Sequence, residues 1–298
     1  MEMIQISERC FYFNGAVNIG YMTDGESGLM IDAGLDKSAA KKVKRKLGEK
    51  GMPLTDLFIT HAHADHYGGA QELVKGGGVT VYAPALEEAV LRYPILEPYY
   101  LFQGNEPPAE LRNKFLEGPP LTADAVVEEG ECRIGPFAVE LVELGGHSMY
   151  QLGLLADGVL FAADGYFGTD QLAKHKIPYL IDAGKTIASL NKLLGMECDG
   201  AVPGHGQFEK EWQKTVQANL DYHEKVLASM VSLLENEGGL LSQEDLVRLM
   251  CKTWNVHLNN LGSWALYRTA VTAYAEALIA RSKAEFVVHD YKMCVKLK

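Results

Sequence analysis

The sequence has few cysteines, no long apolar run and no low-complexity tract, and each absence excludes a class of protein. The five cysteines are scattered and odd in number, with none in C-x-x-C spacing, which predicts reduced thiols rather than a disulfide framework. No apolar run approaches the length that spans a bilayer, and the first residues lack the basic and apolar parts of a signal peptide. We therefore expect a soluble cytoplasmic protein with no membrane partner.

An excess of positive charge is also missing. The formal net charge is −11, which argues against nonspecific binding to nucleic acid or to an anionic membrane. Residues 207–298 contain eleven basic and eleven acidic residues, so the negative excess lies entirely in residues 1–206. The apolar fraction of 47% is that of an ordinary folded protein, so wholesale disorder is excluded.

The first two thirds of the chain predict a mixed α/β layered domain, and the last third predicts long helices. We expect strands at 4–13, 16–22, 28–31, 57–59, 79–82, 125–127, 132–144 (with a break at Gly135-Pro136), 151–155, 159–162 and 201–202, and helices at 37–50, 68–75 and 181–194. Further helices are expected at 210–236, 243–253 and 263–282, followed by a hairpin at 286–297, which is the outline of a winged-helix module. This pattern divides the chain into a domain 1–207 and a C-terminal region 208–298.

Residues 84–121 differ in character from the rest of the first domain. They hold seven of the eleven prolines together with several tyrosines and phenylalanines. Two interpretations stay open: a lid over a binding site, or a surface excursion that packs on its own aromatic side chains.

Histidine is scarce, and its distribution is uneven. Three of the nine histidines, His61, His63 and His66, lie in one turn with Asp65, directly after the apolar residues 57–59. Two histidines two residues apart in an extended backbone share a face and can bind one cation. Asp65 and His66 then suit a second cation. The alternative is a surface turn that caps a helix, with Asp65 as the N-cap residue.

Three more ligand candidates follow predicted strands, each beside glycine: His147, Asp164 and His205. Glycine lets the backbone turn sharply and approach other groups closely. With the first motif these residues make seven nitrogen or oxygen ligands. Seven ligands exceed the needs of one tetrahedral zinc but suit two metals that share a carboxylate.

These motifs resemble those of the metallo-β-lactamase-fold hydrolase superfamily, specifically its binuclear, glyoxalase-II-like branch. The resemblance covers approximately residues 1–210. It rests on the complete first metal motif at 60–66, on Gly146-His147-Ser148, on Asp164 as the bridging aspartate, on Pro203-Gly204-His205-Gly206, and on Asp32 as the family's buried aspartate.

The resemblance implies two divalent cations and a set of ligands for each. One cation would be held by His61, His63 and His147, the other by Asp65, His66 and His205, with Asp164 and a hydroxide bridging them. Asp32 would orient a ligand histidine from behind. Zinc is the default metal, and iron and manganese suit the same ligands.

The implied fold is of the α+β class: a four-layer αββα sandwich with the metals at one edge, here followed by a mostly helical C-terminal appendage. The bridging aspartate argues against a true β-lactamase, and His63 argues against the flavodiiron branch, which has glutamate there. The positions with which glyoxalase II binds glutathione in its C-terminal helices are not matched, so that substrate is not implied.

The implied activity is metal-dependent hydrolysis of a small ester, thioester or lactone. Asp65 would orient and shuttle the proton, and Tyr166 is a candidate to present its hydroxyl to the oxyanion or to the substrate. A metal-dependent phosphodiesterase or endoribonuclease is the second hypothesis, which the acidic charge opposes. The third is a non-enzymatic metal-binding sensor or regulator, although structural zinc sites usually close with four ligands.

The C-terminal helices and the remaining histidines carry less information. Helix 263–282 has only two basic residues, Arg268 and Arg281, too few for a DNA-reading helix. We expect the C-terminal region to pack on the first domain, to close one wall of the pocket, or to form a homodimer contact. The histidines outside the motifs are expected to be surface or packing residues: His175, His223, His257 and His289.

Overall fold

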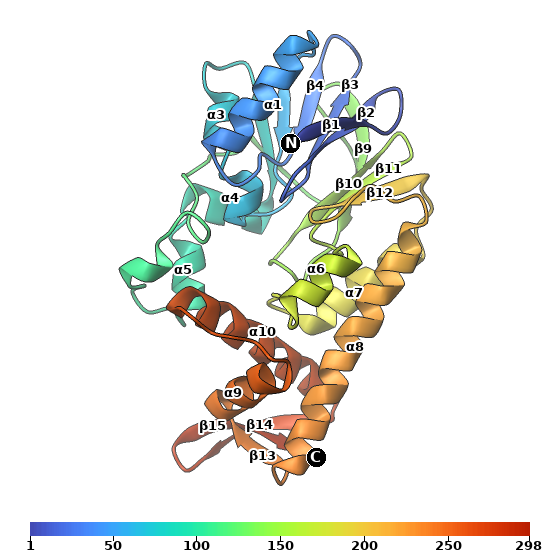
Figure 1. The fold of residues 1–298 in the computed structure, drawn as a ribbon. Helices are drawn as coiled ribbons and strands as arrows, with labels where there is room; N and C mark the ends of the chain where they lie inside the picture. Colours follow the sequence, from blue (N-terminus) through green and yellow to red (C-terminus); the bar gives the residue numbers. More distant parts are fainter.

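The computed structural model describes residues 1–298, and two β-sheets form its centre (Figure 1). The first sheet has the order β1-β2-β3-β4-β5-β6-β7; neighbours pair antiparallel as far as β4 and parallel from β4 onward. Its strands are β1 (Glu2–Gln5), β2 (Cys10–Asn14), β3 (Ile19–Thr23), β4 (Gly28–Ile31), β5 (Asp56–Phe58), β6 (Thr80–Pro84) and β7 (Ala125–Val127).

The second sheet has five strands in the order β12-β11-β10-β9-β8, with only β11 and β12 parallel. Its strands are β8 (Gly130–Ile134), β9 (Phe137–Glu143), β10 (Leu152–Ala156), β11 (Val159–Ala163) and β12 (Gly200–Pro203). The turn between β10 and β11 places Asp157 and Gly158 at positive φ, the conformation that a tight Asp-Gly hairpin requires.

Apolar side chains from both sheets meet in one cluster. Phe58 and Ile31 from the first sheet pack with Phe137, Leu154 and Phe161 from the second. Each large apolar side chain buried in this way contributes roughly 1.5–3 kcal/mol relative to exposure.

Helices cover the outer face of each sheet, which completes an αββα arrangement (Figure 1). On the first sheet lie α1 (Lys37–Glu49) and α3 (Ala70–Val74). Asp36 caps α1 by accepting hydrogen bonds from the backbone N–H groups of Ser38 and Ala39. On the second sheet lie α7 (Ala183–Leu194) and the first turns of α8 (Trp212–Asn236), whose Trp212 is fully buried.

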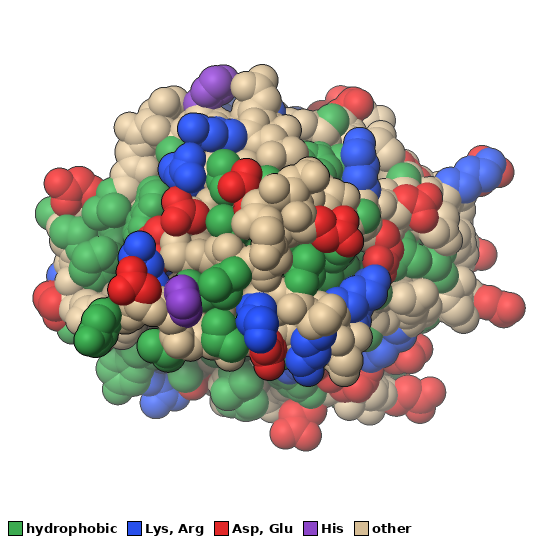
Figure 2. All heavy atoms as spheres, turned by 90° about the horizontal axis from the view of Figure 1, so that it is seen from below, with side chains coloured by type: hydrophobic (Ala, Val, Ile, Leu, Met, Phe, Trp, Pro, Cys, Tyr) green, Lys and Arg blue, Asp and Glu red, His purple; other side chains and the backbone are tan.

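A second apolar cluster joins the C-terminal region to Ile177, Leu180 and Ala183 of the first domain, and α8 extends into it (Figure 1). The other elements there are α9 (Gln243–Thr253), α10 (Leu261–Ala280) and a three-stranded sheet in the order β13-β15-β14, formed by β13 (Leu240–Ser242), β14 (Ala284–His289) and β15 (Lys292–Leu297). On the face seen from below in Figure 2, basic and acidic side chains are interspersed rather than gathered by sign. No helix combines the length and the apolar character needed to cross a membrane.

The segment 84–121 forms α4 (Ala85–Arg92), α5 (Leu96–Leu101) and a short 3-10 turn at Ala109–Leu111. It reaches the C-terminal region, because Leu101, Leu111 and Leu116 pack against Ala265 of α10. Figure 1 shows α5 and α10 facing each other below the sheets.

Several predicted elements need correction. The single strand expected at 4–13 is two strands, because residues 6–9 turn back and pair β1 with β2. The helix expected at 68–75 is the shorter α3, and a one-turn helix that was not predicted, α2 (Ala64–Tyr67), precedes it. The sequence analysis did not predict α4, α5, β13 or α6 (Thr169–His175).

Candidate metal centre

The seven predicted ligand residues lie at one edge of the two sheets. His61, His63, Asp65 and His66 follow β5 and enter α2. The other three come from the loop between β9 and β10, from the end of β11 and from the end of β12: His147, Asp164 and His205. Strand ends from both sheets therefore bring together side chains that are up to 144 positions apart in the chain.

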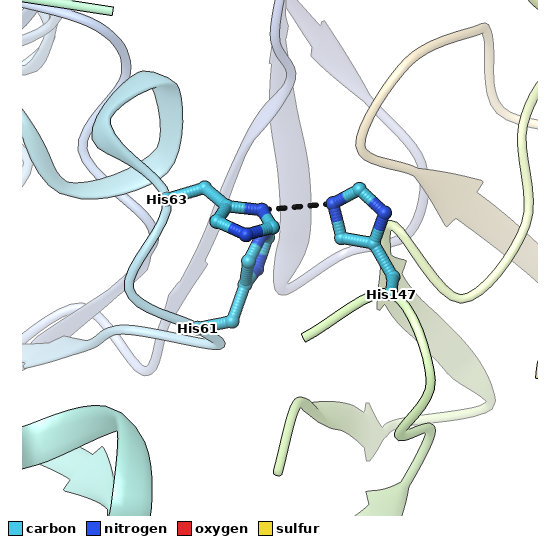
Figure 3. A group of neighbouring side chains, drawn as sticks. All are labelled: His61, His63 and His147. Atoms are coloured by element: carbon cyan, nitrogen blue, oxygen red, sulfur yellow. Dashed lines mark hydrogen bonds between the residues drawn. The ribbon is translucent and has the colours of Figure 1, made fainter. Parts of the chain in front are cut away.

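Three histidines form the first group. One ring nitrogen from each of His61, His63 and His147 lies within 4.8 Å of the others, and all three residues are buried. Nδ1 of His63 and Nε2 of His147 are 2.8 Å apart and point toward each other (Figure 3). Three convergent imidazole nitrogens are a common protein ligand set for zinc.

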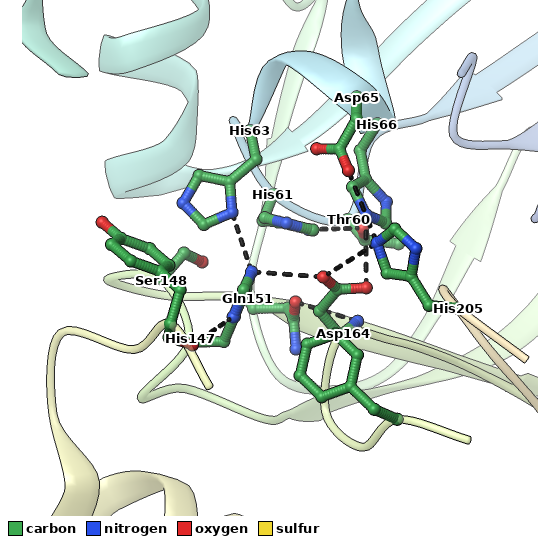
Figure 4. Close-up of polar contacts among 12 residues, drawn as sticks. Thr60, His61, His63, Asp65, His66, His147, Ser148, Gln151, Asp164 and His205 are labelled. Carbon is green, nitrogen blue, oxygen red and sulfur yellow. Dashed lines mark hydrogen bonds and ion pairs between the residues drawn. The ribbon is translucent and has the colours of Figure 1, made fainter. Parts of the chain in front are cut away.

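Asp65, His66 and His205 form the second group, and Asp164 lies between the two groups (Figure 4). Oδ1 of Asp164 is 3.3 Å from Nε2 of His66. Its Oδ2 is 3.2 Å from Nε2 of His147 and 3.4 Å from Nε2 of His205. One carboxylate therefore faces ligand candidates of both groups.

The outer ring nitrogens of four histidines are anchored by the protein. His66 Nδ1 is 2.7 Å from Asp32 Oδ2, and His61 Nδ1 is 3.0 Å from the Thr60 hydroxyl. His147 Nδ1 and His205 Nδ1 lie 3.1 and 2.8 Å from the carbonyl oxygens of Tyr179 and Ala16. Such anchoring is the usual support for metal-binding histidines.

Three of the inward-facing atoms lack comparable partners. Nε2 of His61, Nε2 of His66 and Oδ1 of Asp164 are buried without a hydrogen bond. Buried polar atoms are normally paired. Anchored outer nitrogens on four histidines and these three unpaired inner atoms fit divalent cations bound between the two groups.

Asp32 connects two of these histidines. Its carboxylate contacts His66 directly and accepts hydrogen bonds from the backbone N–H of Thr60 (2.9 Å) and from the Thr60 hydroxyl. The same hydroxyl contacts His61. Asp32 is 3% exposed and has a φ of 64°, a left-handed conformation that aspartate tolerates better than most residues.

The pKa shifts reflect this crowding. Burial lowers the pKa of His63 and of His147 to about 4. Burial also disfavours the charged form of His205, yet Asp164 and Asp65 outweigh it and raise the pKa of His205 to about 10. The carboxylates therefore create a potential that favours positive charge where a cation would bind.

Gly204 allows the chain to pass close to this centre. A Cβ at Gly204 would lie 2.1 Å from Asp164 Oδ1 and 2.9 Å from a carbon of His66. Only glycine fits beside His205 without displacing the candidate ligands.

A cavity of about 380 Å³ opens onto both groups, within the size range of small-molecule sites. Its other walls come from three places: Glu97, Phe115 and Leu116 of the 84–121 segment; Phe167, His175, Pro178 and Tyr179 of the segment after β11; and Leu266 of α10. No lysine or arginine lines it. A second cavity, of about 410 Å³, lies in the C-terminal region between α9 and α10 and contains none of the seven residues.

The C-terminal region holds one wall of the site cavity in place. Asn219 of α8 accepts a hydrogen bond from the Phe167 backbone N–H (2.9 Å) and donates one to its carbonyl oxygen (2.7 Å). The hydroxyls of Tyr222 and Tyr267 donate to the carbonyl oxygens of Lys176 and His175. The Phe167 ring in turn stacks on His205, with the ring centres 5.7 Å apart.

Tyr166 is not brought to the cavity. Its ring packs near Trp212 in the cluster between the second sheet and its helices, and its hydroxyl is buried without a partner. Burial raises the pKa of Tyr166 well above its ordinary value. The side chain of the next residue, Phe167, lines the cavity instead, because the backbone turns after Asp164.

Sequence reasoning missed other residues of the site. His175, expected to be a surface or packing residue, lines the cavity and packs its ring against Phe167. Glu87 is 2% exposed, and it joins the first histidine motif to the segment 148–150 through three hydrogen bonds. Residues 84–121 contain six glutamates, and nothing in the local sequence distinguishes Glu87 from the others.

The comparisons with known proteins agree with this architecture. The family described as the metallo-beta-lactamase superfamily matches residues 12–205. A hydroxyacylglutathione hydrolase of Rhodopseudomonas palustris (strain BisB18) is 29% identical over 154 residues, which are 50% of this chain and 48% of that protein. The probable metallo-hydrolase YflN of Bacillus subtilis is 27% identical over 216 residues, 62% of this chain and 77% of that protein.

The likeness in fold extends further than the likeness in sequence. A beta-lactamase domain protein from Burkholderia ambifaria superposes with a TM-score of 0.71 at 17% identity, covering 100% of this chain and 94% of that one. The chain spans about half the length of the first curated relatives it matches. With the family match covering most of the sandwich and all seven candidate ligands, this chain belongs to the metallo-beta-lactamase superfamily.

Proposed function

We propose that this chain is a binuclear metal-dependent hydrolase of a small ester, thioester or lactone. The observation that carries the proposal is the donor set: seven side chains converge, the outer nitrogens of four histidines are anchored, and three inner atoms have no hydrogen bond. A structural metal site would be closed by four ligands and would not open onto a cavity.

Each donor has a place in the proposed centre. His61, His63 and His147 would hold one cation, and Asp65, His66 and His205 the other, with Asp164 shared. Zinc is the default for such ligands, and iron or manganese also suits them. Two divalent cations, when bound, supply Lewis-acid polarisation and lower the pKa of a water molecule toward neutrality.

Asp65 has a further role in the proposal. Its Oδ2 lies 3.4 Å from His205 Nε2, and the residue lines the cavity. A carboxylate with a second oxygen facing the cavity can orient the attacking water and accept its proton. Asp32 would keep His61 and His66 in the orientation that ligation requires.

The cavity walls favour a compact, partly apolar substrate. Phe115, Leu116 and Leu266 supply apolar surface, and the absence of lysine and arginine leaves nothing to pair with phosphate groups. A nuclease binds its substrate largely through cations on the phosphate backbone. The same argument weighs against glutathione, whose two carboxylates would face a cavity without lysine or arginine.

The test combines metal content with turnover. Protein purified without added metal is analysed for metals and assayed on a thioester, a lactone, a phosphodiester and an RNA hairpin. Asp164→Ala removes the shared carboxylate and should lower ester or thioester turnover by about a thousand-fold, equivalent to ~4 kcal/mol of transition-state stabilisation. Asp157→Asn, in the β10–β11 turn, is the matched control because asparagine also tolerates positive φ.

Each outcome decides between the hypotheses. Two equivalents of metal with ester, thioester or lactone turnover that Asp164→Ala abolishes would support the proposal and choose the substrate class. Turnover of the phosphodiester or RNA alone would replace it with a nuclease. Little metal and no turnover, in protein that stays folded and is resupplied with zinc, would leave only the non-enzymatic sensor.

A further inference from the structure

Two glutamates of the 84–121 segment are buried beside the candidate centre, and they differ in one respect. Glu87 accepts hydrogen bonds from the backbone N–H groups of Ala62 (2.9 Å) and Tyr150 (2.8 Å) and from the Ser148 hydroxyl (2.8 Å). Glu97 of α5 is as deeply buried, 3% exposed against 2% for Glu87, yet its Oε2 has no hydrogen-bond partner. Buried carboxyl oxygens normally have partners, so Glu97 lacks one that the chain itself does not supply.

The missing partner has room to bind. Glu97 lines the cavity that also exposes Asp65, His147 and Asp164. The hydroxyl of Tyr179, another residue of the cavity wall, is likewise buried without a hydrogen bond. The remaining surface near them is apolar, and no lysine or arginine lines the cavity to pair with Glu97. A molecule bound next to the candidate centre would therefore meet an acceptor in an apolar pocket.

We propose that Glu97 determines substrate specificity by accepting a hydrogen bond from an N–H or O–H group in the acyl part of the substrate. The preferred substrate is then a small ester, thioester or lactone that is neutral or cationic and carries such a donor near its carbonyl group. This inference rests on the proposed hydrolase function. A carboxyl group offers an acceptor oxygen in either protonation state, so this hydrogen bond forms whether or not Glu97 is ionised.

Such a pocket should discriminate between substrates that carry a hydrogen-bond donor and substrates that lack one, and this difference in kcat/KM can be measured. A site built to hydrogen-bond a polar group rejects the analogue that lacks it, because the buried protein group is then left unpaired. A purely apolar acyl chain would leave Glu97 unpaired, and an acyl group ending in a carboxylate would place two acidic groups together. Both should be poorer substrates than a hydroxy or amino acyl ester.

The experiment uses four 4-nitrophenyl esters: those of butanoic, 2-hydroxybutanoic, 3-hydroxybutanoic and 3-aminobutanoic acid. The hydroxyl and ammonium compounds separate the two kinds of donor, and the two hydroxy acids vary its position. The variants are Glu97→Leu, which removes the acceptor, and Glu97→Gln, which keeps an amide oxygen in its place. Glu110→Gln, at an exposed position of the same segment, is the control. Metal content is measured for each, and calorimetry gives the affinity for the corresponding 4-nitroanilides, which serve as slowly cleaved analogues.

We expect the wild-type chain to favour at least one donor-bearing ester over the butanoate by about tenfold or more in kcat/KM. Glu97→Leu should remove that preference by lowering kcat/KM for the donor-bearing ester about 10–100-fold. The same variant should raise kcat/KM for the butanoate, because no buried carboxyl group is then left unpaired, and its metal content should match the wild type. Glu97→Gln should keep part of the preference. The anilide affinities should follow the same order.

Two results would overturn the inference: a wild-type chain without preference for a donor, or a Glu97→Leu variant in which all four esters fall equally. Failure of the hydrolase proposal is distinguishable from both. If the metal-loaded chain hydrolyses no ester, the anilide affinities alone decide the role of Glu97. A donor preference in binding that Glu97→Leu abolishes would then support it, and equal affinities would end it.

Discussion

The two parts of the chain contribute to the site in different ways. Residues 1–207 supply all seven candidate ligands and the aspartate behind them. Residues 208–298 supply none of these, yet Leu266 closes the cavity, and Asn219, Tyr222 and Tyr267 hold the segment that carries Phe167 and His175.

The first part of the chain therefore supplies the groups that can bind metal, whereas the second part helps to set the shape of the cavity. Ligand side chains are recognisable in a sequence because few residue types can bind a metal and their spacing is constrained. The walls that select a substrate are built from ordinary apolar and polar residues, which cannot be identified from residue type or spacing alone. We therefore expect variants of the first part to change metal binding and variants of the second part to change turnover or stability with the metal retained.

Outside the seven candidate ligands, the largest effect is expected at Asp32, which lies behind them. Asp32→Asn keeps the shape and tolerates the positive φ, but it removes the charge that contacts His66 and, through Thr60, His61. Loss of such a partner typically weakens metal affinity about 10–100-fold. Competition with a zinc chelator measures the dissociation constant. An unchanged constant would show that Asp32 supports only the local backbone.

A smaller effect is expected at Asn219, in the second part. Asn219→Leu leaves the N–H and the carbonyl oxygen of Phe167 without their partner. The displaced wall should lower kcat/KM about tenfold and stability by about 1–3 kcal/mol, while both metals stay bound. Gln217→Leu, an exposed position of α8, is the control. Loss of metal in Asn219→Leu would break the proposed separation between the two parts.

The smallest effect concerns pH and the C-terminal cluster. His223 is 3% exposed, and its Nδ1 lies 2.6 Å from the Tyr274 hydroxyl; burial lowers the pKa of His223 to about 4. In the unfolded chain the imidazole of His223 binds a proton at about pH 6.5, whereas in the folded protein it does so only near pH 4. The folded state is therefore not penalised above pH 6.5, and it loses free energy of unfolding as the pH falls from 6.5 toward 4.

Between pH 7 and pH 5.5 the protonation of His223 should lower the free energy of unfolding by about 1 kcal/mol. His223→Gln should make this decrease smaller, as measured by denaturant unfolding of the metal-loaded protein at pH 7 and at pH 5.5. An equal loss in the variant would assign the acid sensitivity to other groups.

Much of the fold was predictable because its patterns are local. The helix at 37–50 and the strand at 125–127 agree with α1 and β7 to within one residue. The predicted break at Gly135-Pro136 separates β8 from β9, and the hairpin at 286–297 matches β14 and β15. The prediction of one strand at 4–13 failed because residues 6–9 contain no glycine, proline or asparagine that would signal a turn. The turn is stabilised instead by the Ser7 hydroxyl, which accepts a hydrogen bond from the Cys10 backbone N–H, and by the pairing of β1 with β2.

The sequence by itself determined a layered α/β domain and the residues capable of holding metal, because hydrophobic period and ligand chemistry are properties of nearby residues. The two-sheet sandwich followed from the resemblance of those ligand motifs to a known family. Tertiary structure alone decided that Phe167 rather than Tyr166 faces the cavity, that His175 lines it, and that Glu97 is buried beside it without a partner. Those outcomes depend on how α5, α8 and α10 pack around the strand ends. That packing joins residues more than one hundred positions apart, and no local pattern records it.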